Sequence, residues 1–330
     1  MYYSLGIDEK LLQEVKDAET SLAPVFSHFE SICEYWSVRI LNAFREAHVS
    51  EYSFFSSCGY GYNDDGRSAV EDVYSKVFGT EKALVRPQMV SGTHAITLGL
   101  RGVLRPGDRV VLATGLPYDT MQTVMGLSGN SPSALNLYNI DFDVLPLKDN
   151  HIDLEGLKDK LSKPAKMVYF QRSRGYSGGG LAQSGGYLVG KADLVELAAE
   201  ALTAPGLGSE VGATLNQTKL VLQGLYQAPI MVLQAMKSAA LFATVLHKRG
   251  YWVSPKPEEK RTDTVQLLGF NQKEDLIHFC QAIQHSSPID SFVTPEPAPM
   301  PGYENEVIMA AGTFVQGATS ELIGRICKDL

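Results

Sequence analysis

The chain has 330 residues, of which 44% are hydrophobic and 20% are charged, as in an ordinary globular protein with one large domain or two of average size. Its net charge of −8 argues against a nucleic-acid surface, which needs clustered lysine and arginine. The N-terminal stretch has no signal-peptide pattern and no apolar run reaches membrane-spanning length. We therefore expect a cytoplasmic protein that contacts neither membrane nor nucleic acid.

Helical periodicity fills the first part of the chain and gives way to a glycine-rich loop. Residues 8–48 repeat apolar side chains at helical spacing, and the stretch SSCGYGYNDDGRS (56–68) combines the glycines and aspartates of a loop. The following stretch SAVEDVYSKVFG predicts a helix that stops at Gly79.

Strands and helices then alternate. We predict strands over Ala83–Arg86, Arg109–Ala113, 142–147 and AKMVYF (165–170), with helices between them, which indicates an α/β domain with a mostly parallel sheet. Long helices follow Gly190, and the last part reads as a smaller α+β domain. The predicted domains are an N-terminal helical segment (1–50), a large domain (51–235) and a small C-terminal domain (236–330).

Four cysteines, Cys33, Cys58, Cys280 and Cys327, have no spacing typical of metal ligands. Free thiols in a reducing compartment are the ordinary interpretation. We predict no metal site.

The stretch VSGTHAITLGL places a glycine and two hydroxyl residues directly before a helix. Backbone N–H groups at a helix N-terminus, together with such hydroxyls, form an anion site for which phosphate is a natural ligand. An ordinary N-cap by Ser91 or Thr93 would give the same pattern.

Two further loops carry aromatic side chains. Tyr118, in TGLPYDT, follows a strand end, where α/β proteins place ligand-binding loops, and it either stacks on a flat ring or simply packs there. The loop CGYGYNDDGR holds Tyr60, Tyr62 and Arg67; it is either a solvated turn or a segment that reaches a phosphate across a subunit interface.

A resemblance connects these loops with stretches that cover nearly the whole chain. The matching stretches include GYGYNDDGR, ALVRPQMVSGTHAI, GLPYDTMQTVMG, MVYFQRSRGYS, GGGLAQSGGYLVGK and SPIDSFVTPEPAPMPGYENEVIMAAGTFVQGATSEL. The chain resembles the pyridoxal-phosphate enzymes of cysteine and methionine metabolism, and more narrowly the methionine gamma-lyase-like family often labelled aluminium-resistance proteins. This implies the fold-type I pyridoxal-phosphate transferase fold, with residues 51–235 as the cofactor-binding domain and pyridoxal 5'-phosphate as the cofactor.

The resemblance also assigns roles to residues of the three loops. Ser91, Gly92 and Thr93 match the residues that hold the cofactor phosphate, and Tyr118 matches a tyrosine that stacks on the pyridine ring and protonates a sulfur leaving group. Tyr60 and Tyr62 match residues that approach the phosphate of a neighbouring subunit, so a homodimer or homotetramer is expected. Tyr62 stands where the family would have an arginine, which leaves that pair incompletely matched.

One part of the pattern is missing. The resemblance implies a Schiff-base lysine and an acid at the pyridine nitrogen, both between Ser177 and Gly178, where QRSRGYS runs directly into GGGLA. The missing part would be at least one helix–strand unit, roughly 30 residues or more. Lys191 follows the glycines and begins a helix, so it is not the expected lysine.

Either the chain carries a deletion, or the sequence joins parts of a longer protein. We expect the second, because removing a central strand from a parallel sheet would destroy its core. A second missing segment is expected near residue 322. It would hold the arginine that binds the substrate carboxylate, a role that we do not assign to Arg325.

The function implied by the resemblance is a carbon–sulfur lyase that acts on a sulfur amino acid and releases thiol, ammonia and a 2-oxo acid. Two alternatives stay open. One is a pyridoxal-phosphate-binding protein of aluminium or stress tolerance with little turnover. The other is a different carbanion reaction, such as transamination.

Overall fold

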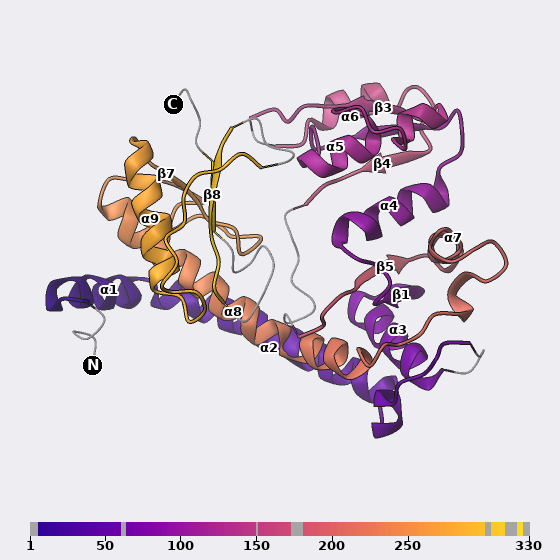
Figure 1. The fold of residues 1–330 in the computed structure, drawn as a ribbon, viewed down its shortest axis with the longest axis horizontal. Coiled ribbons are helices and arrows are strands. Elements are labelled where there is room, and N and C mark those ends of the chain that lie inside the picture. The colour runs from indigo at the N-terminus through magenta and orange to yellow at the C-terminus, as the bar shows by residue number, and fades with distance from the viewer. Residues whose placement is uncertain are drawn as a thin grey trace. The chain divides into compact units, whose positions relative to one another are not determined.

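The computed structural model describes residues 6–60, 64–149, 151–172, 181–300, 305–313 and 322–325. The chain forms two compact units (Figure 1). The first comprises Met1–Asn42, Ser173–Leu181 and Leu220–Leu330, and the second comprises Ala43–Arg172 and Ala182–Lys219.

The helices in chain order are α1 (Glu9–Ser21), α2 (Ala23–Glu46), α3 (Asp65–Phe78), α4 (Gly92–Val103), α5 (Asp119–Met125), α6 (Leu154–Lys160), α7 (Ala192–Leu202), α8 (Thr218–Lys248) and α9 (Lys273–His285). Short 3₁₀ helices are η2 (Glu51–Phe54), η3 (Leu135–Tyr138) and η4 (Gly208–Glu210). The strands are β1 (Lys82–Arg86), β2 (Arg109–Leu112), β3 (Asp141–Val144), β4 (Met167–Tyr169), β5 (Gly186–Gly190), β6 (Trp252–Ser254), β7 (Leu267–Gly269), β8 (Val307–Ala310) and β9 (Leu322–Arg325).

The second unit contains a parallel sheet of three strands in the order β3-β2-β4. Val110 of the central strand β2 pairs with Phe142 on one side and with Met167 on the other. A parallel strand with neighbours on both sides reads as a continuous apolar run. The sequence of β2, RVVL, fits this rule, and its three apolar residues are fully buried.

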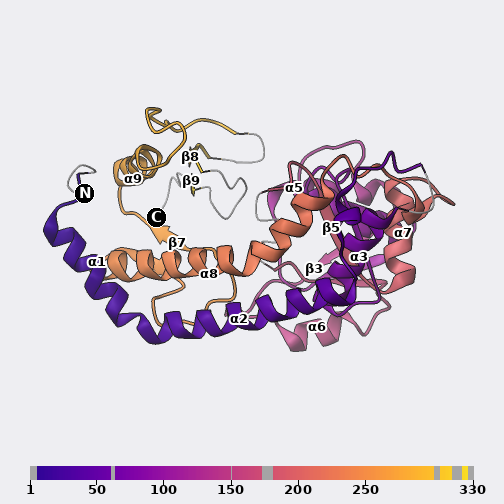
Figure 2. The same ribbon diagram turned by 90° about the horizontal axis from the view of Figure 1, so that it is seen from below.

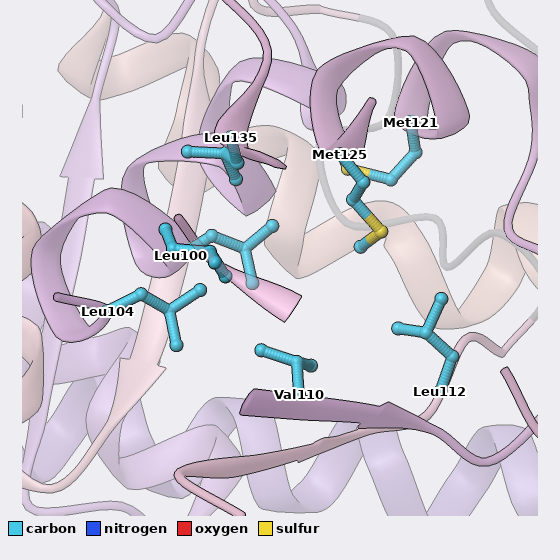
Figure 3. Close-up of a cluster of buried hydrophobic side chains, with 8 residues drawn as sticks. Leu100, Leu104, Val110, Leu112, Met121, Met125 and Leu135 are labelled. Atoms are coloured by element: carbon cyan, nitrogen blue, oxygen red, sulfur yellow. The ribbon is translucent and has the colours of Figure 1, made fainter. Parts of the chain in front are cut away.

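The core beside this sheet is formed by α4, α5, η3 and β2 (Figure 3). Its buried members are Leu100, Leu104, Val110, Leu112, Met121, Met125, Leu135 and Ile140. Both methionines of α5 are completely buried, so this short helix is fixed to the strand that precedes it. The core therefore holds the loop between β2 and α5 in place from both ends.

A separate antiparallel pair, β1 and β5, lies against α4 and α7, with Leu84 opposite Leu188. Here the structure corrects the expectation of one large, mostly parallel sheet, because no described strand joins β4 to β5. The α/β class is as predicted. The physical reason for the division lies in the sequence: only a short stretch separates β4 from β5, and it has no room for another crossover helix and strand.

Helices α4 and α7 approach each other closely at Gly102. A Cβ atom at this position would lie 2.7 Å from the backbone of Leu197. Only glycine fits such a contact between two helix backbones without a shift.

In the first unit, α2 runs alongside α8 (Figure 2). Leu22 and Phe29 pack against Met236 and Ala240 in a small core. The hairpins β6–β7 and β8–β9 also belong to this unit, and β8 packs on α9. The described cysteines Cys33, Cys58 and Cys280 are free thiols.

Helix α8 requires a correction to the expectation about membrane-spanning segments. Its most apolar 18-residue window has a mean hydropathy of 1.5, and only 28% of that window is buried. Polar residues such as Gln223, Gln227 and Gln234 interrupt the apolar run, so no unbroken stretch stands out in the sequence. By length and composition alone the helix is able to cross a membrane, although core helices of water-soluble proteins pass the same test.

Candidate phosphate and cofactor site

The N-terminus of α4 forms the centre of the candidate site. Ser91 is the N-cap residue, and its hydroxyl accepts a hydrogen bond of 3.1 Å from the backbone N–H of His94. Gly92 begins the helix, and a Cβ atom added there would meet no atom within 4 Å. The capping interpretation is therefore correct for Ser91, and open space remains beside Gly92 at the start of the helix, as an anion site requires.

Tyr118 reaches this helix terminus from the end of the neighbouring strand. Its hydroxyl lies 2.9 Å from the hydroxyl of Thr93, at hydrogen-bonding distance. Tyr118 is the N-cap residue of α5 and packs against the core beside β2. The structure thus brings together two residues that are far apart in the sequence and that were both predicted for the site.

A second group of side chains supports Tyr118, and the sequence reasoning gave them no role. The side-chain oxygen Oε1 of Gln171 accepts a hydrogen bond of 3.3 Å from the backbone N–H of Tyr118 and one of 3.4 Å from the Tyr169 hydroxyl. The backbone N–H of Gln171 donates to Oγ1 of Thr114 at 3.0 Å. The available signal was position: these residues stand at the carboxyl ends of two adjacent parallel strands, β2 and β4.

Burial makes the hydroxyl of Tyr169 a weaker acid than that of an ordinary tyrosine. Burial, and to a smaller extent the nearby Tyr118 hydroxyl, raises the pKa of Tyr169 to about 12. The Tyr169 hydroxyl therefore keeps its proton throughout the neutral range and stays a hydrogen-bond donor.

The other predicted residues lie elsewhere. Tyr60 is 92% exposed, so within one chain it does not enter the candidate phosphate site at the N-terminus of α4. Tyr62 lies outside the described residues. Arg67 is buried and donates to the backbone oxygens of Glu210 and Gly212 at 2.8 and 3.4 Å, which ties α3 to the segment after η4. We therefore assign Arg67 a structural role within the chain.

Two basic residues considered for the cofactor can also be located. Lys191 is the exposed N-cap residue of α7, at the far end of β5, as the sequence predicted. Arg325 ends β9, and its side chain lies outside the described part of the structure, as does the stretch from Ser173 to Gly180.

These residues fit one part of pyridoxal phosphate. The open N-terminus of α4 and the Thr93 hydroxyl suit a phosphate dianion, and the half-buried Tyr118 offers an aromatic face and a hydroxyl. The hydrogen-bonded group of Thr93, Tyr118, Tyr169 and Gln171 contains no lysine. Within this described group, no side chain would attach the cofactor covalently.

Fold and site together define an α/β protein with a candidate phosphate site where the N-terminus of α4 meets Tyr118, beyond the end of the parallel strand β2. The chain belongs to the methionine gamma-lyase family, whose model matches residues 11–178 and again residues 177–325. The two matched parts meet at Ser177 and Gly178, which is where the sequence lacks the expected unit.

Relatives agree with this assignment. The Bacillus subtilis protein YnbB is 38% identical over 381 residues, covering 98% of this chain and 90% of the relative. That alignment is longer than the 330 residues of this chain, so the relative has residues with no counterpart here.

Solved structures show the same relationship. A carbon–sulfur lyase involved in aluminium resistance from Clostridium novyi has a TM-score of 0.89 and 35% identity, covering 94% of this chain and 87% of that one. A Bacillus cereus protein has a TM-score of 0.92 and 36% identity, covering 97% and 93%. The pyridoxal-phosphate-dependent Escherichia coli protein YhfS, at 16% identity, a TM-score of 0.55 and coverage of 86% and 87%, shares the fold.

Proposed function

We propose that this protein is a pyridoxal-phosphate-dependent carbon–sulfur lyase of the fold-type I class that acts on a sulfur amino acid. The observation that carries the proposal is the Tyr118 hydroxyl, held 2.9 Å from Thr93 beside the open N-terminus of α4. Membership of the methionine gamma-lyase family and the likeness to the Clostridium novyi lyase support it.

Each residue of the candidate phosphate site has a separate task. The first N–H groups of α4, with the Thr93 hydroxyl, would bind the phosphate, and the Tyr118 ring would stack on the pyridine. The cofactor, when bound, supplies an electron sink for the carbanion of the substrate. The Tyr118 hydroxyl is then placed to donate its proton to a departing sulfur atom.

The lysine that binds the cofactor and the acid at its ring nitrogen are proposed to lie in a segment between Ser177 and Gly178. The joint between the two family matches at this point supports this proposal, and so does the longer alignment with the Bacillus subtilis relative.

We further propose that the protein is a cytoplasmic homo-oligomer. Aromatic side chains are exposed in and near the loop that was predicted to reach a neighbouring subunit: Tyr52 is 75% exposed, Phe55 67% and Tyr60 92%. Where exposed apolar side chains form a contiguous patch, the patch commonly marks an interaction site. We propose that a second copy covers them and that the loop of Tyr60 then reaches the phosphate site of that copy.

The test of the proposed lyase function is product analysis. The protein is incubated with pyridoxal phosphate and with methionine, cystathionine or cysteine, and thiol, ammonia and 2-oxo acid are measured together. A lyase releases all three in equal amounts from at least one substrate. Release of 2-oxo acid without thiol would indicate transamination, and binding of the cofactor without any product would indicate a protein with little turnover. Either result would overturn the proposal.

A further inference from the structure

We propose that Gln171 is a positioning residue: its side-chain oxygen holds the backbone of Tyr118 and thereby sets where the tyrosine hydroxyl meets the reacting sulfur. This inference rests on the proposed lyase function for its purpose. The hydrogen bond from the Tyr118 N–H to Gln171 is present in the structure and can be measured independently of lyase activity.

Gln171 contacts both ends of one loop. The loop that follows β2 runs from Thr114 to Tyr118, and Gln171 binds the first residue through its backbone N–H and the last through Oε1. Because Gln171 follows β4 almost directly, the loop is attached to the end of the adjacent strand. Gln171 therefore fixes the loop from Thr114 to Tyr118, which follows β2, to the end of β4.

The hydrogen bond from the Tyr118 backbone to Gln171 affects the position of the Tyr118 hydroxyl. The hydroxyl lies at the far end of a long, rigid ring, so a small shift of the Tyr118 backbone moves the hydroxyl by a comparable or larger amount. The hydroxyl's described hydrogen bond, to Thr93, joins it to the group that would also contact the phosphate. A general acid must lie within hydrogen-bonding reach of its target, and a displacement of about 1 Å can cost about 10²-fold in rate.

The Gln171 side-chain oxygen has a second donor in Tyr169. Tyr169 donates to the same Oε1 atom at 3.4 Å. Burial raises the pKa of Tyr169 to about 12, so the hydroxyl keeps its proton well above the neutral range. A rotated amide group would put its NH₂ against the backbone N–H of Tyr118, which can only donate. The side chain of Gln171 therefore has a reason to keep its oxygen facing Tyr118 at working pH.

The test compares three substitutions. Gln171→Met keeps the length of the side chain and removes the acceptor, whereas Gln171→Glu keeps an acceptor oxygen. The control is Gln281→Met, which removes a half-buried glutamine of the first unit whose side chain donates to the backbone oxygen of Pro295 at 3.1 Å. Should Gln171→Met fail to fold, Gln171→Asn serves in its place, because its shorter side chain withdraws the acceptor from the Tyr118 N–H.

The first measurement is amide hydrogen exchange at Tyr118 in the protein without added cofactor. We expect exchange to accelerate by at least about tenfold in Gln171→Met, because the N–H loses its acceptor, and to stay at the parent rate in Gln171→Glu and Gln281→Met. Parent-like exchange of Tyr118 in Gln171→Met would overturn the proposal.

The second measurement uses the holoenzyme and substrates with good and poor thiol leaving groups. In Gln171→Met we expect the affinity for pyridoxal phosphate to change less than about threefold. The rate for poor leaving groups should fall by at least about tenfold, with a smaller fall for good ones, and Gln171→Glu should restore it. An equal fall for both kinds of substrate, as from a merely structural defect, would contradict the positioning role. A parent that releases no thiol would instead overturn the lyase function, and the exchange measurement would still decide whether Gln171 holds Tyr118.

Discussion

At Gly92, the effect of an added negative charge on phosphate binding can be tested separately from steric effects. A side chain added there would enter open space, and an acidic residue in the first turn of a helix is favourable for folding. We predict that Gly92→Asp folds as the parent does and binds pyridoxal phosphate at least about tenfold more weakly, because a carboxylate then lies close to a dianion. Titration of the cofactor by its absorbance measures the affinity.

Gly92→Asn is the matched control, since asparagine has the shape of aspartate without its charge. We expect a much smaller loss of affinity from it. If Asp and Asn weaken binding equally, the cause is steric, and if neither does, the phosphate binds elsewhere.

Tyr118 permits stacking and proton donation to be separated. Tyr118→Phe keeps the aromatic face, which contributes about 0.5–1.5 kcal/mol, and removes the hydroxyl, whose proton transfer is typically worth about 10²–10⁴-fold in rate. We predict near-normal cofactor affinity and an elimination rate at least about tenfold lower, with smaller losses for good thiol leaving groups. Steady-state kinetics across a series of thioether substrates measures both.

Tyr118→Ala provides the comparison, because it removes both the face and the hydroxyl. If elimination is unchanged in Tyr118→Phe while Tyr118→Ala no longer binds the cofactor, Tyr118 is only a stacking surface.

Among the secondary-structure elements, β2, β3 and α6 meet at one carboxylate. Asp143 of β3 accepts hydrogen bonds from Arg109 of β2 and Lys160 of α6. The hydrogen bond from Lys160, followed by that from Arg109, lowers the pKa of Asp143 below its ordinary value of 3.8. A lowered folded-state pKa gives stability that is fully present above the unfolded-state value and is lost as the pH falls through the folded-state value.

We therefore predict that Asp143→Asn lowers the free energy of unfolding by about 1–2 kcal/mol at pH 7. The difference from the parent should shrink as the pH falls below about 4. Denaturant unfolding at several pH values measures it. Asp141→Asn is the control, since this carboxylate is 72% exposed and 3.9 Å from Arg109, and it should change stability by less than about 0.5 kcal/mol. A loss from Asp143→Asn that does not depend on pH would contradict the ion-pair explanation.

Individual helices and strands were predicted from the sequence better than the contacts between them. Gly79 ends α3 in a left-handed conformation with φ of 67°, as predicted, whereas the helix begins at Asp65, earlier than expected, because the Asp64 side chain accepts from the Arg67 N–H and caps it. The contact between Gln171 and Tyr118 spans 53 positions and exists only because β2 and β4 are adjacent. Periodicity cannot supply such a pairing.

The candidate site was predicted in part for the same reason. Ser91, Gly92 and Thr93 are recognisable because a helix N-terminus is a local feature. Arg67 is different: its burial against backbone oxygens of residues 210 and 212 depends on the folded unit, so its structural role was not evident beforehand. The domain boundaries at residues 50 and 235 stay a prediction.

For the whole molecule, the division between β4 and β5 leads to a prediction about mass. We predict that the protein purified from its natural source is longer than this chain and has a lysine between Ser177 and Gly178. Intact-mass spectrometry should then give a value well above 36.0 kDa. Borohydride reduction in the presence of pyridoxal phosphate should attach the cofactor to that lysine.

A mass near 36.0 kDa would mean that the chain is complete in this region. In that case reduction should label no unique lysine, and the proposed lyase function would fail with it.

The assembly is the second property of the whole molecule that can be tested. We predict at least a dimer at micromolar concentration, because closed symmetric dimers are the commonest assembly and the aromatic residues around Tyr60 are uncovered in one chain. Sedimentation velocity with cofactor present measures it. Tyr60→Ala should lower cofactor affinity if the loop completes the site of a neighbour, whereas a monomeric parent would contradict the prediction.

The close contact of α4 with α7 has a consequence for how this binding site can change over time. Gly102 and Gly92 lie near opposite ends of one helix, about 15 Å apart at 1.5 Å per residue. A larger residue at position 102 must push α4 away from the Leu197 backbone, and a short, straight helix carries that displacement to its other end. Substitutions at Gly102, which no ligand would touch, can therefore change the affinity for phosphate during evolution. A protein engineer can use the same position to change that affinity without altering the residues that bind the phosphate.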